Sequence, residues 1–119
     1  MPNPVVHFEV LGSDGPALQA FYSKAFDWQI DADNPMNYGL VDNADEGIGG
    51  GIAARESADD PGVMFYIEVP DINEALQAVG AAGGKTVQEL TEIPGMVIMA
   101  QFADPDGNVI GLVQAGSDG

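Results

Sequence analysis

The stretch VVHFEV at Val5–Val10 decides the fold, because a closely similar stretch, MFYIEV, recurs at Met64–Val69. Both stretches are rich in β-branched and aromatic residues, and their apolar positions alternate with a period of two, which is typical of strands. One face of each strand is then apolar and expected in the core, and in the second strand it holds Phe65, Ile67 and Val69. His7 and Glu9 lie on the other face of the first strand. A strand-like stretch that occurs twice in one chain indicates two copies of one structural unit.

Each of the two strands is followed by a segment with the apolar spacing of an amphipathic helix, over Ala17–Phe26 and over Ile72–Ala82. Ser13 or Asp14 is expected to cap the first helix and Asp71 the second. Such short side chains carry an oxygen that accepts a hydrogen bond from an N–H group at the start of a helix. The strand and the helix therefore repeat together.

Six further strands are predicted, three after each helix. They are expected at residues 27–32, 36–41, 47–54, 85–90, 96–102 and 109–114. A tight hairpin is predicted at Asp104–Asn108, because Asp-Pro followed by Asp-Gly-Asn is a strong turn signal. The expected fold is α+β, a single domain over residues 1–119 with one βαβββ module at 4–55 and a second at 62–115.

The composition limits the classes of partner. The 119 residues carry 19 acidic against 3 basic side chains, which gives a formal net charge of −16. Nucleic acid and anionic membrane surfaces are disfavoured as partners, since both are bound through basic patches. No apolar run reaches the ~18 residues that a membrane span needs, and no cysteine is present for a disulfide or a thiolate metal site. The expected location is cytoplasmic.

Two longer stretches, FYSKAFDWQI at Phe21–Ile30 and FADPDGNVIGLV at Phe102–Val113, extend this pattern. Together with the βαβββ order they resemble the vicinal oxygen chelate superfamily, which includes glyoxalase I, bleomycin-resistance proteins and extradiol dioxygenases. The resemblance implies that the two modules curl into a half-open barrel whose single concave cleft holds a small-molecule ligand. It also implies a homodimer.

Metal-dependent members of this superfamily hold a divalent ion through one ligand from the first strand and one from the last strand of each module. Carried over to this chain, these positions are His7, Tyr66, Gly51 and Gly111. Only the imidazole is a strong ligand, whereas a catalytic site needs about three protein ligands. The resemblance therefore implies a site without a metal or other cofactor. The alternative is one divalent ion held by His7 and a glutamate in a changed geometry.

The candidates for chemistry are His7, Glu9, Tyr66 and Glu68. An unperturbed imidazole titrates near pH 6.5, so His7 could act as an acid or base, contact a ligand, or form a structural hydrogen bond. Tyr66 could donate to a ligand or fill the space of the absent metal. Glu9 and Glu68 could form a carboxylate pair with shifted pKa values, replace missing metal ligands, or lie in water at the rim of the cleft.

Further residues are expected to shape the cleft. Gly51 and Gly111 would enlarge its floor, because neither carries a side chain. Apolar side chains could line it or belong to the core instead: Trp28, Tyr38, Met64, Met96, Met99 and Phe102.

The leading hypothesis for function is metal-independent binding of a small, partly apolar molecule in the cleft. The negative net charge favours cationic ligands. One alternative is a divalent-metal-dependent enzyme, either a lyase of the lactoylglutathione lyase type or a dioxygenase. The other is a metal-free enzyme in which His7 or Tyr66 transfers a proton.

Overall fold

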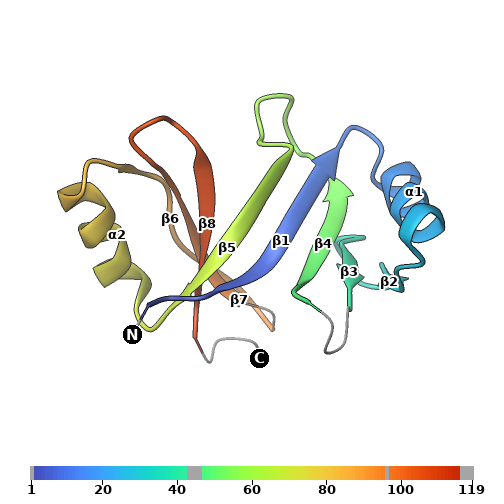
Figure 1. Ribbon diagram of the computed structural model, residues 1–119, viewed down its shortest axis with the longest axis horizontal. Helices are drawn as coiled ribbons and strands as arrows, with labels where there is room; N and C mark the ends of the chain where they lie inside the picture. The colour runs from blue at the N-terminus through green and yellow to red at the C-terminus, as the bar shows by residue number, and fades with distance from the viewer. Residues whose placement is uncertain (1, 43–46, 96, 116–119) are drawn as a thin grey trace. The chain divides into compact units, whose positions relative to one another are not determined.

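The computed structural model describes residues 2–42, 47–95 and 97–115. Met96, one of the predicted lining residues, lies outside them. The chain divides into two compact units: the first unit comprises residues 7–64, and the second unit comprises residues 65–119 with the first six residues. The described residues follow the order strand, helix and three strands twice, so the α+β class and the repeated βαβββ module are confirmed (Figure 1).

The first unit is built on β1 (Val5–Gly12), α1 (Gly15–Phe26), β2 (Ile30–Asp31), β3 (Gly39–Val41) and β4 (Gly49–Ala54). Its strands are ordered β2-β3-β4-β1, with α1 packed on β4. The β3 strand is antiparallel to both its neighbours, whereas β1 and β4 are parallel. This parallel pairing sets Glu9 opposite Gly51, so both positions face the same side of the sheet.

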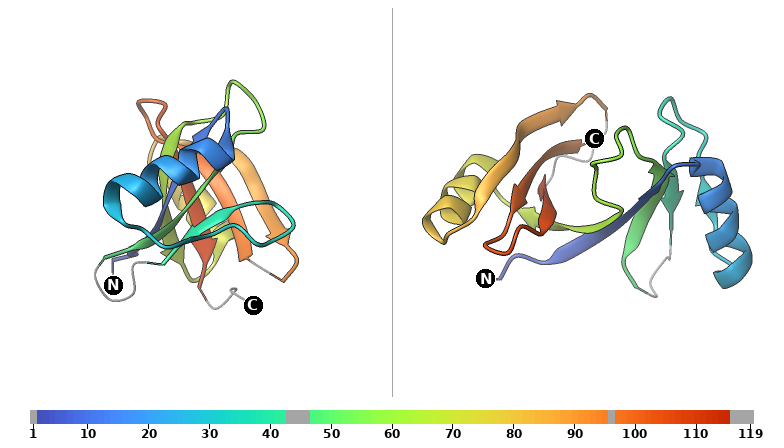
Figure 2. Two further views of the ribbon diagram at one scale, coloured as in Figure 1. Left: turned by 90° about the vertical axis from the view of Figure 1, so that its right-hand side faces the viewer. Right: turned by 90° about the horizontal axis from the view of Figure 1, so that it is seen from above.

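The second unit is built on β5 (Val63–Val69), α2 (Ile72–Ala81), β6 (Lys85–Ile93), β7 (Val97–Ala103) and β8 (Val109–Gln114). Its strands are ordered β5-β8-β7-β6, again with the first and last strands of the module parallel. The helix α2 contacts β6, β7 and β8, and Figure 2 shows it lying against the sheet of this unit. The β5–β8 pairing sets Tyr66 opposite Gly111.

Both helices begin at an aspartate, as predicted. Asp14, and not Ser13, caps α1, and Asp71 caps α2; each carboxylate accepts a hydrogen bond from the N–H three residues on, at 3.0 and 3.1 Å. The helix α1 ends at Asp27, whose φ of 60° places it in the left-handed region. After α2 the chain turns at Gly83, where φ is +103° and glycine is favoured.

The predicted hairpin between β7 and β8 is confirmed. The Asp104 carboxylate accepts hydrogen bonds from the backbone N–H groups of Asp106 and Asn108, each at 2.9 Å. The Asn108 side chain also donates to Asp104, at 2.9 Å to Oδ2. These bonds lower the pKa of Asp104, the one from the Asn108 side chain most, and they hold the turn closed.

The core of the second unit is aliphatic. Four buried side chains, Val69, Ile72, Ala100 and Leu112, pack together, and none is more than 3% exposed. In this cluster the first residue of α2 lies against strands from both sides of the hairpin, so helix and sheet depend on each other.

The first unit instead carries a chain of aromatic rings with centroids 5.0–6.1 Å apart. Its members, called here the aromatic cluster, are Phe8, Phe21, Tyr22, Phe26 and Trp28. Phe21 and Phe26 are 57% and 58% exposed, so the outer part of this cluster is an apolar surface.

The strands predicted at 27–32 and 36–41 are too long: the structure has only Ile30–Asp31 and Gly39–Val41. The cause is Asn34, whose side-chain oxygen accepts hydrogen bonds from the N–H groups of Met36 and Tyr38, at 3.2 and 2.9 Å. An asparagine side chain that binds the backbone in this way competes with strand pairing and folds the segment into a loop.

The predicted apolar face of β5 is wrong in part. Phe65 was expected in the core but is 39% exposed, whereas Met64 and Tyr66 on the opposite face are 4% and 8% exposed. The face that carries Tyr66 is covered because the ring lies on Gly111, where no side chain holds it off the sheet. A period of two identifies the two faces of a strand but not which of them is covered.

The edge strand of the second unit, β6, continues past its predicted end at residue 90 to Ile93. Its pairing with β7 is irregular, with register shifts on both sides of Gln88. Neither helix in the described part of the chain is both long and apolar enough to cross a bilayer.

Candidate functional site

Three polar side chains of the first unit, those of His7, Glu9 and Tyr38, are joined by hydrogen bonds. The Tyr38 hydroxyl donates a hydrogen bond to Glu9 Oε1 at 2.9 Å and lies 2.9 Å from His7 Nε2. The Tyr38 and His7 rings are nearly parallel, at 13°, with centroids 6.2 Å apart. His7 and Glu9 are two positions apart on β1 and share one face, so a hydroxyl between them bridges an imidazole and a carboxylate.

The backbone around Tyr38 is held from two sides. Asn34 accepts from the Tyr38 N–H at 2.9 Å and donates to the Tyr38 carbonyl at 2.8 Å. Gln19 on α1 donates to the carbonyl of Asn37 at 3.1 Å and to that of Ile52 on β4 at 2.7 Å. The loop is therefore attached both to itself and to the helix and the sheet, which fixes where the Tyr38 ring can lie.

The Tyr38 ring occupies the space above Gly51. A Cβ built on Gly51 would overlap the outer ring carbons and the hydroxyl oxygen of Tyr38. The expectation that Gly51 opens space is therefore wrong. The missing side chain makes room for a tyrosine that comes from another part of the same unit.

Gly111 in the second unit is covered in the same manner, since a Cβ there would overlap the ring of Tyr66. Gly111 therefore also does not leave an open floor. The pairing registers differ, however: Tyr66 lies opposite Gly111, whereas His7 lies opposite Gly49. By register, the counterpart of Gly111 is Gly49, and the sequence alignment with Gly51 is displaced by two residues.

The structure thus brings His7, Glu9, Tyr38 and Gly51 together in the first unit. Glu9 is only 8% exposed, so the alternative that it lies in water at a rim is wrong. Glu68 is partly buried and belongs to the second unit, as do Tyr66 and Gly111.

The apolar candidates lie in other surroundings. Trp28 packs on Phe8, whose side chain points to the opposite face of β1 from His7. Met64 and Met99 are buried, at 4% and 9% exposure, and Phe102 packs against the aliphatic core of the second unit. Trp28 and Phe102 thus contribute to packing in their own units.

Sequence reasoning placed Tyr38 only as a lining residue and missed its hydroxyl. The signal that was present is the spacing of Asn34 and Tyr38, in which an asparagine side chain can bind the backbone four residues on. That spacing predicts a tight loop. It does not show that the loop returns to β1.

Burial lowers the pKa of His7 from its ordinary value of 6.5, because removal from water disfavours the charged imidazolium. His7 is therefore predominantly neutral at pH 7, with a proton on one ring nitrogen only. The first unit combines a neutral imidazole, a hydroxyl and a buried carboxylate, a set that can bind a polar group or move a proton.

The residues at the metal-ligand positions do not fit a divalent ion. His7 Nε2 is engaged by Tyr38, the Tyr66 ring fills the space above Gly111, and Gly49, which lies opposite His7, has no side chain to offer. Within residues 2–42, 47–95 and 97–115, no group of three or more histidine, cysteine, aspartate or glutamate side chains is placed to hold a metal. The side chains at the metal-ligand positions thus provide one imidazole and one phenol, fewer than the three protein ligands of a catalytic metal site.

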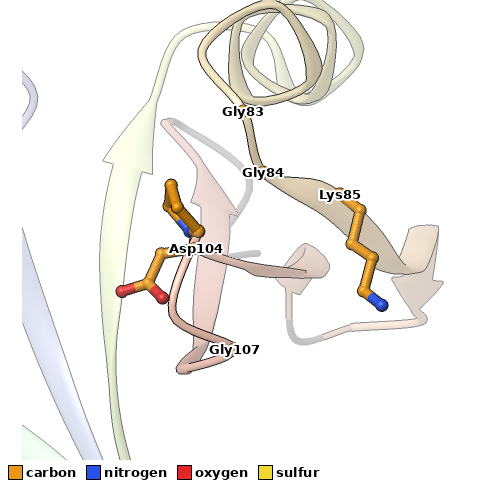
Figure 3. A pocket seen from close by; sticks show the side chains of 6 residues that line it. Gly83, Gly84, Lys85, Asp104 and Gly107 are labelled. Carbon is orange, nitrogen blue, oxygen red and sulfur yellow. The ribbon is translucent and has the colours of Figure 1, made fainter.

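A separate pocket of about 280 Å³ lies in the second unit where α2 ends and the β7–β8 hairpin turns. Its charged residues, Lys85 and Asp104, point away from each other (Figure 3). Glycines and Pro105 form most of the remaining lining. The pocket therefore offers no converging polar groups to a ligand.

The sequence of the chain is similar to one protein family and to a protein of related description. The family model described as Glyoxalase/Bleomycin resistance protein/Dioxygenase superfamily matches residues 5–112. A glyoxylase-like domain-containing protein from Didymella fabae is 27% identical over 122 residues, which cover 87% of this chain and 91% of that protein.

Two solved structures show the same fold. A hypothetical protein from Bacillus halodurans C-125 superposes with a TM-score of 0.73 at 14% identity, covering 100% of this chain and 99% of the other. Methylmalonyl-CoA epimerase from Mycobacterium tuberculosis superposes with a TM-score of 0.68 at 14% identity, covering 92% and 86%. At such identities the likeness extends to the fold alone.

Proposed function

The chain belongs to the glyoxalase/bleomycin resistance protein/dioxygenase superfamily, and on that premise we propose that it binds a small, partly apolar molecule without a metal ion. The observation that carries the proposal is the bridge formed by Tyr38 between His7 and Glu9, with its ring over Gly51. The superfamily is known for small-molecule ligands, and a methylmalonyl-CoA epimerase of the same fold has been solved with methylmalonyl-CoA.

The chemistry of the bridge supports binding. His7 and Tyr38 are both partly exposed. Glu9 is buried beside them, and a buried carboxylate interacts more strongly with a ligand group than one in water. A solute that contacts this side of β1 meets hydrogen-bonding groups that are already held in place, which reduces the entropy lost on binding.

One observation favours a second candidate, a metal-free enzyme. The hydrogen-bonded series His7, Tyr38 and Glu9 connects a neutral imidazole to a carboxylate through one hydroxyl. In such a series the imidazole can take a proton from a bound molecule while Tyr38 and Glu9 stabilise the product state. Turnover that persists in chelator and falls with Tyr38→Phe would distinguish this enzyme from a binding protein.

Two further features are proposed with the binding function. A homodimer is expected from the resemblance, and the exposed rings of Phe21 and Phe26 provide an apolar surface that a second copy would cover. Light scattering on a size-exclusion column measures that state directly. The cytoplasmic location stays a prediction of the sequence.

The binding function is tested by thermal unfolding of the purified chain in EDTA against a library of small apolar and cationic molecules. A ligand that binds only the folded protein raises the melting temperature in a saturable way. Tyr38→Phe keeps the ring over Gly51 and removes the bridging hydroxyl, so it should weaken the response. Tyr22→Phe, the same change inside the aromatic cluster, is the matched control and should not.

The contrary result is equally definite. If stabilisation by every ligand requires added Zn²⁺, Ni²⁺, Mn²⁺ or Fe²⁺, and His7→Ala abolishes it, the protein uses a metal and the proposal is wrong. Elemental analysis of the tag-free protein gives the same answer independently.

A further inference from the structure

We propose that Tyr38 holds His7 as the Nε2–H tautomer and that the site thereby selects a ligand with an N–H donor, an organic ammonium group above all, over a carboxylate. The part that concerns the ligand rests on the proposed binding function. The part that concerns the tautomer rests only on the hydrogen bonds of the first unit.

The tautomer follows from a count of protons. A tyrosine hydroxyl has one proton to donate and two lone pairs that accept. The Tyr38 proton is directed to Glu9 Oε1, so the contact of 2.9 Å with His7 Nε2 needs a proton on that nitrogen. In the neutral imidazole, Nδ1 then carries the lone pair and is the accepting atom of His7.

The ligand class follows from the groups that result. The His7 Nδ1 and the Glu9 oxygen that accepts from Tyr38 are both hydrogen-bond acceptors. A ligand ammonium group supplies donors to these atoms, either adding to their present contacts or replacing one. Its positive charge is opposite to the net charge of the chain, −16. A ligand carboxylate would meet acceptors and like charge, in a chain whose net charge is −16.

The tautomer of His7 also distinguishes this site from a metal site. The nitrogen that faces Tyr38 carries a proton and cannot coordinate a metal in this state, since coordination needs its lone pair. Tyr38 therefore acts as a positioning residue: it does not need to touch the ligand to decide which His7 atom the ligand meets.

The tautomer can be measured without ambiguity because His7 is the only histidine of the chain. Nitrogen-15 NMR of the full chain labelled at histidine, recorded at pH 7.5 in EDTA, reports the proton on each ring nitrogen. We expect Nε2–H in the parent protein, loss of that preference in Tyr38→Phe, and no change in Tyr22→Phe. An Nδ1–H tautomer in the parent, or a preference unchanged by Tyr38→Phe, would overturn the proposal.

The ligand class is tested with two probes of similar size and opposite charge, 2-phenylethylammonium and 3-phenylpropionate, titrated into the same labelled protein in EDTA. We expect saturable shifts of the His7 signals with the ammonium probe alone. Glu9→Gln should weaken its binding about tenfold, the typical loss when a charged hydrogen bond is removed.

Saturable binding of 3-phenylpropionate at His7, or of neither probe, overturns the assigned ligand class. In that event the library in EDTA still decides the proposed function, because any other ligand that stabilises the chain without a metal sustains binding while this inference falls. The two failures are thus distinguishable.

Discussion

In the second unit Tyr66 lies on Gly111, its own partner across the β5–β8 ladder, whereas in the first unit Tyr38 reaches Gly51 from the loop just before β3. Backbone hydrogen bonds of the sheet fix the first of these rings. Side-chain hydrogen bonds of Asn34 fix the second. The ring that covers the glycine therefore comes from the sheet itself in the second unit, and in the first unit, where the polar site lies, from a loop held by side-chain hydrogen bonds.

The packing of the two units also differs: the second has a buried aliphatic cluster, whereas the first has, besides buried Val41 and Ile52, the aromatic cluster with its two exposed rings. Ile72→Ala should lower the free energy of unfolding by about 2–5 kcal/mol, because the Ile72 side chain is 0% exposed and its removal leaves a buried cavity. Phe26→Ala should lower it by about 1 kcal/mol or less, since most of that ring is already in water. Urea denaturation of both variants gives the comparison, and equal losses would mean that the aromatic cluster is covered in solution.

The two covered glycines should respond differently to an added methyl group. Gly111→Ala should destabilise the fold by about 1–3 kcal/mol, because the new Cβ overlaps the Tyr66 ring close to its root. Gly51→Ala should cost less stability, since it overlaps only the far end of Tyr38, but it should displace the hydroxyl and change the His7 NMR signals.

Gly80→Ala is the control for the substitution itself, because nothing lies within 4 Å of a Cβ there. It should stabilise α2 by about 0.5–1 kcal/mol. If Gly51→Ala leaves the His7 signals as they are, Tyr38 does not depend on that glycine and the contrast between the units fails.

The two aspartate caps offer a matched pair. Asp71→Ala should lower the free energy of unfolding by about 1 kcal/mol, with a somewhat smaller loss for Asp14→Ala. The reason is that a proline in the first turn of α1 preorganises its start, while α2 begins with the buried Ile72. Thermal unfolding of the two variants measures both losses of stability. A larger loss in Asp14→Ala than in Asp71→Ala would contradict this prediction.

The smallest expected effect is the pH dependence that His7 gives to the first unit. Its pKa is lowered in the folded protein, so the unfolded chain binds this proton at higher pH than the folded chain does. The contribution to stability is therefore fully present above the ordinary pKa of 6.5 and is lost as the pH falls below it toward the folded pKa. Urea midpoints between pH 7.5 and 5.5 should decline in the parent and decline less in His7→Gln.

Most of the fold could be predicted because its signals are local. The repeat of VVHFEV, the helix periods, the capping aspartates and the turn at Asp104–Asn108 each depend on neighbours in sequence. The parallel pairing of first and last strands depends on contacts distant in sequence, and so does the register that sets Gly49, and not Gly51, opposite His7. A glycine-rich strand specifies register weakly, since it has few side chains to fix it.

The site was predictable in its parts but not in its assembly. His7 and Glu9 share a face by the period of two, which the sequence pattern shows directly. Burial of Glu9 and the bridge through Tyr38 both require the loop at Asn34 to fold back over β1. That path depends on a hydrogen bond from Gln19, a residue whose helical position gives no sign of its partner.

The outer strands of the two units have a further consequence. An open strand edge presents unpaired backbone groups on which another chain can add a strand and begin an aggregate. The edge strand of the first unit, β2, is only two residues long. The edge strand of the second unit, β6, pairs irregularly with β7 and carries the charged residues Lys85, Glu89 and Glu92. Both edge strands therefore offer another chain little regular backbone on which to add a strand.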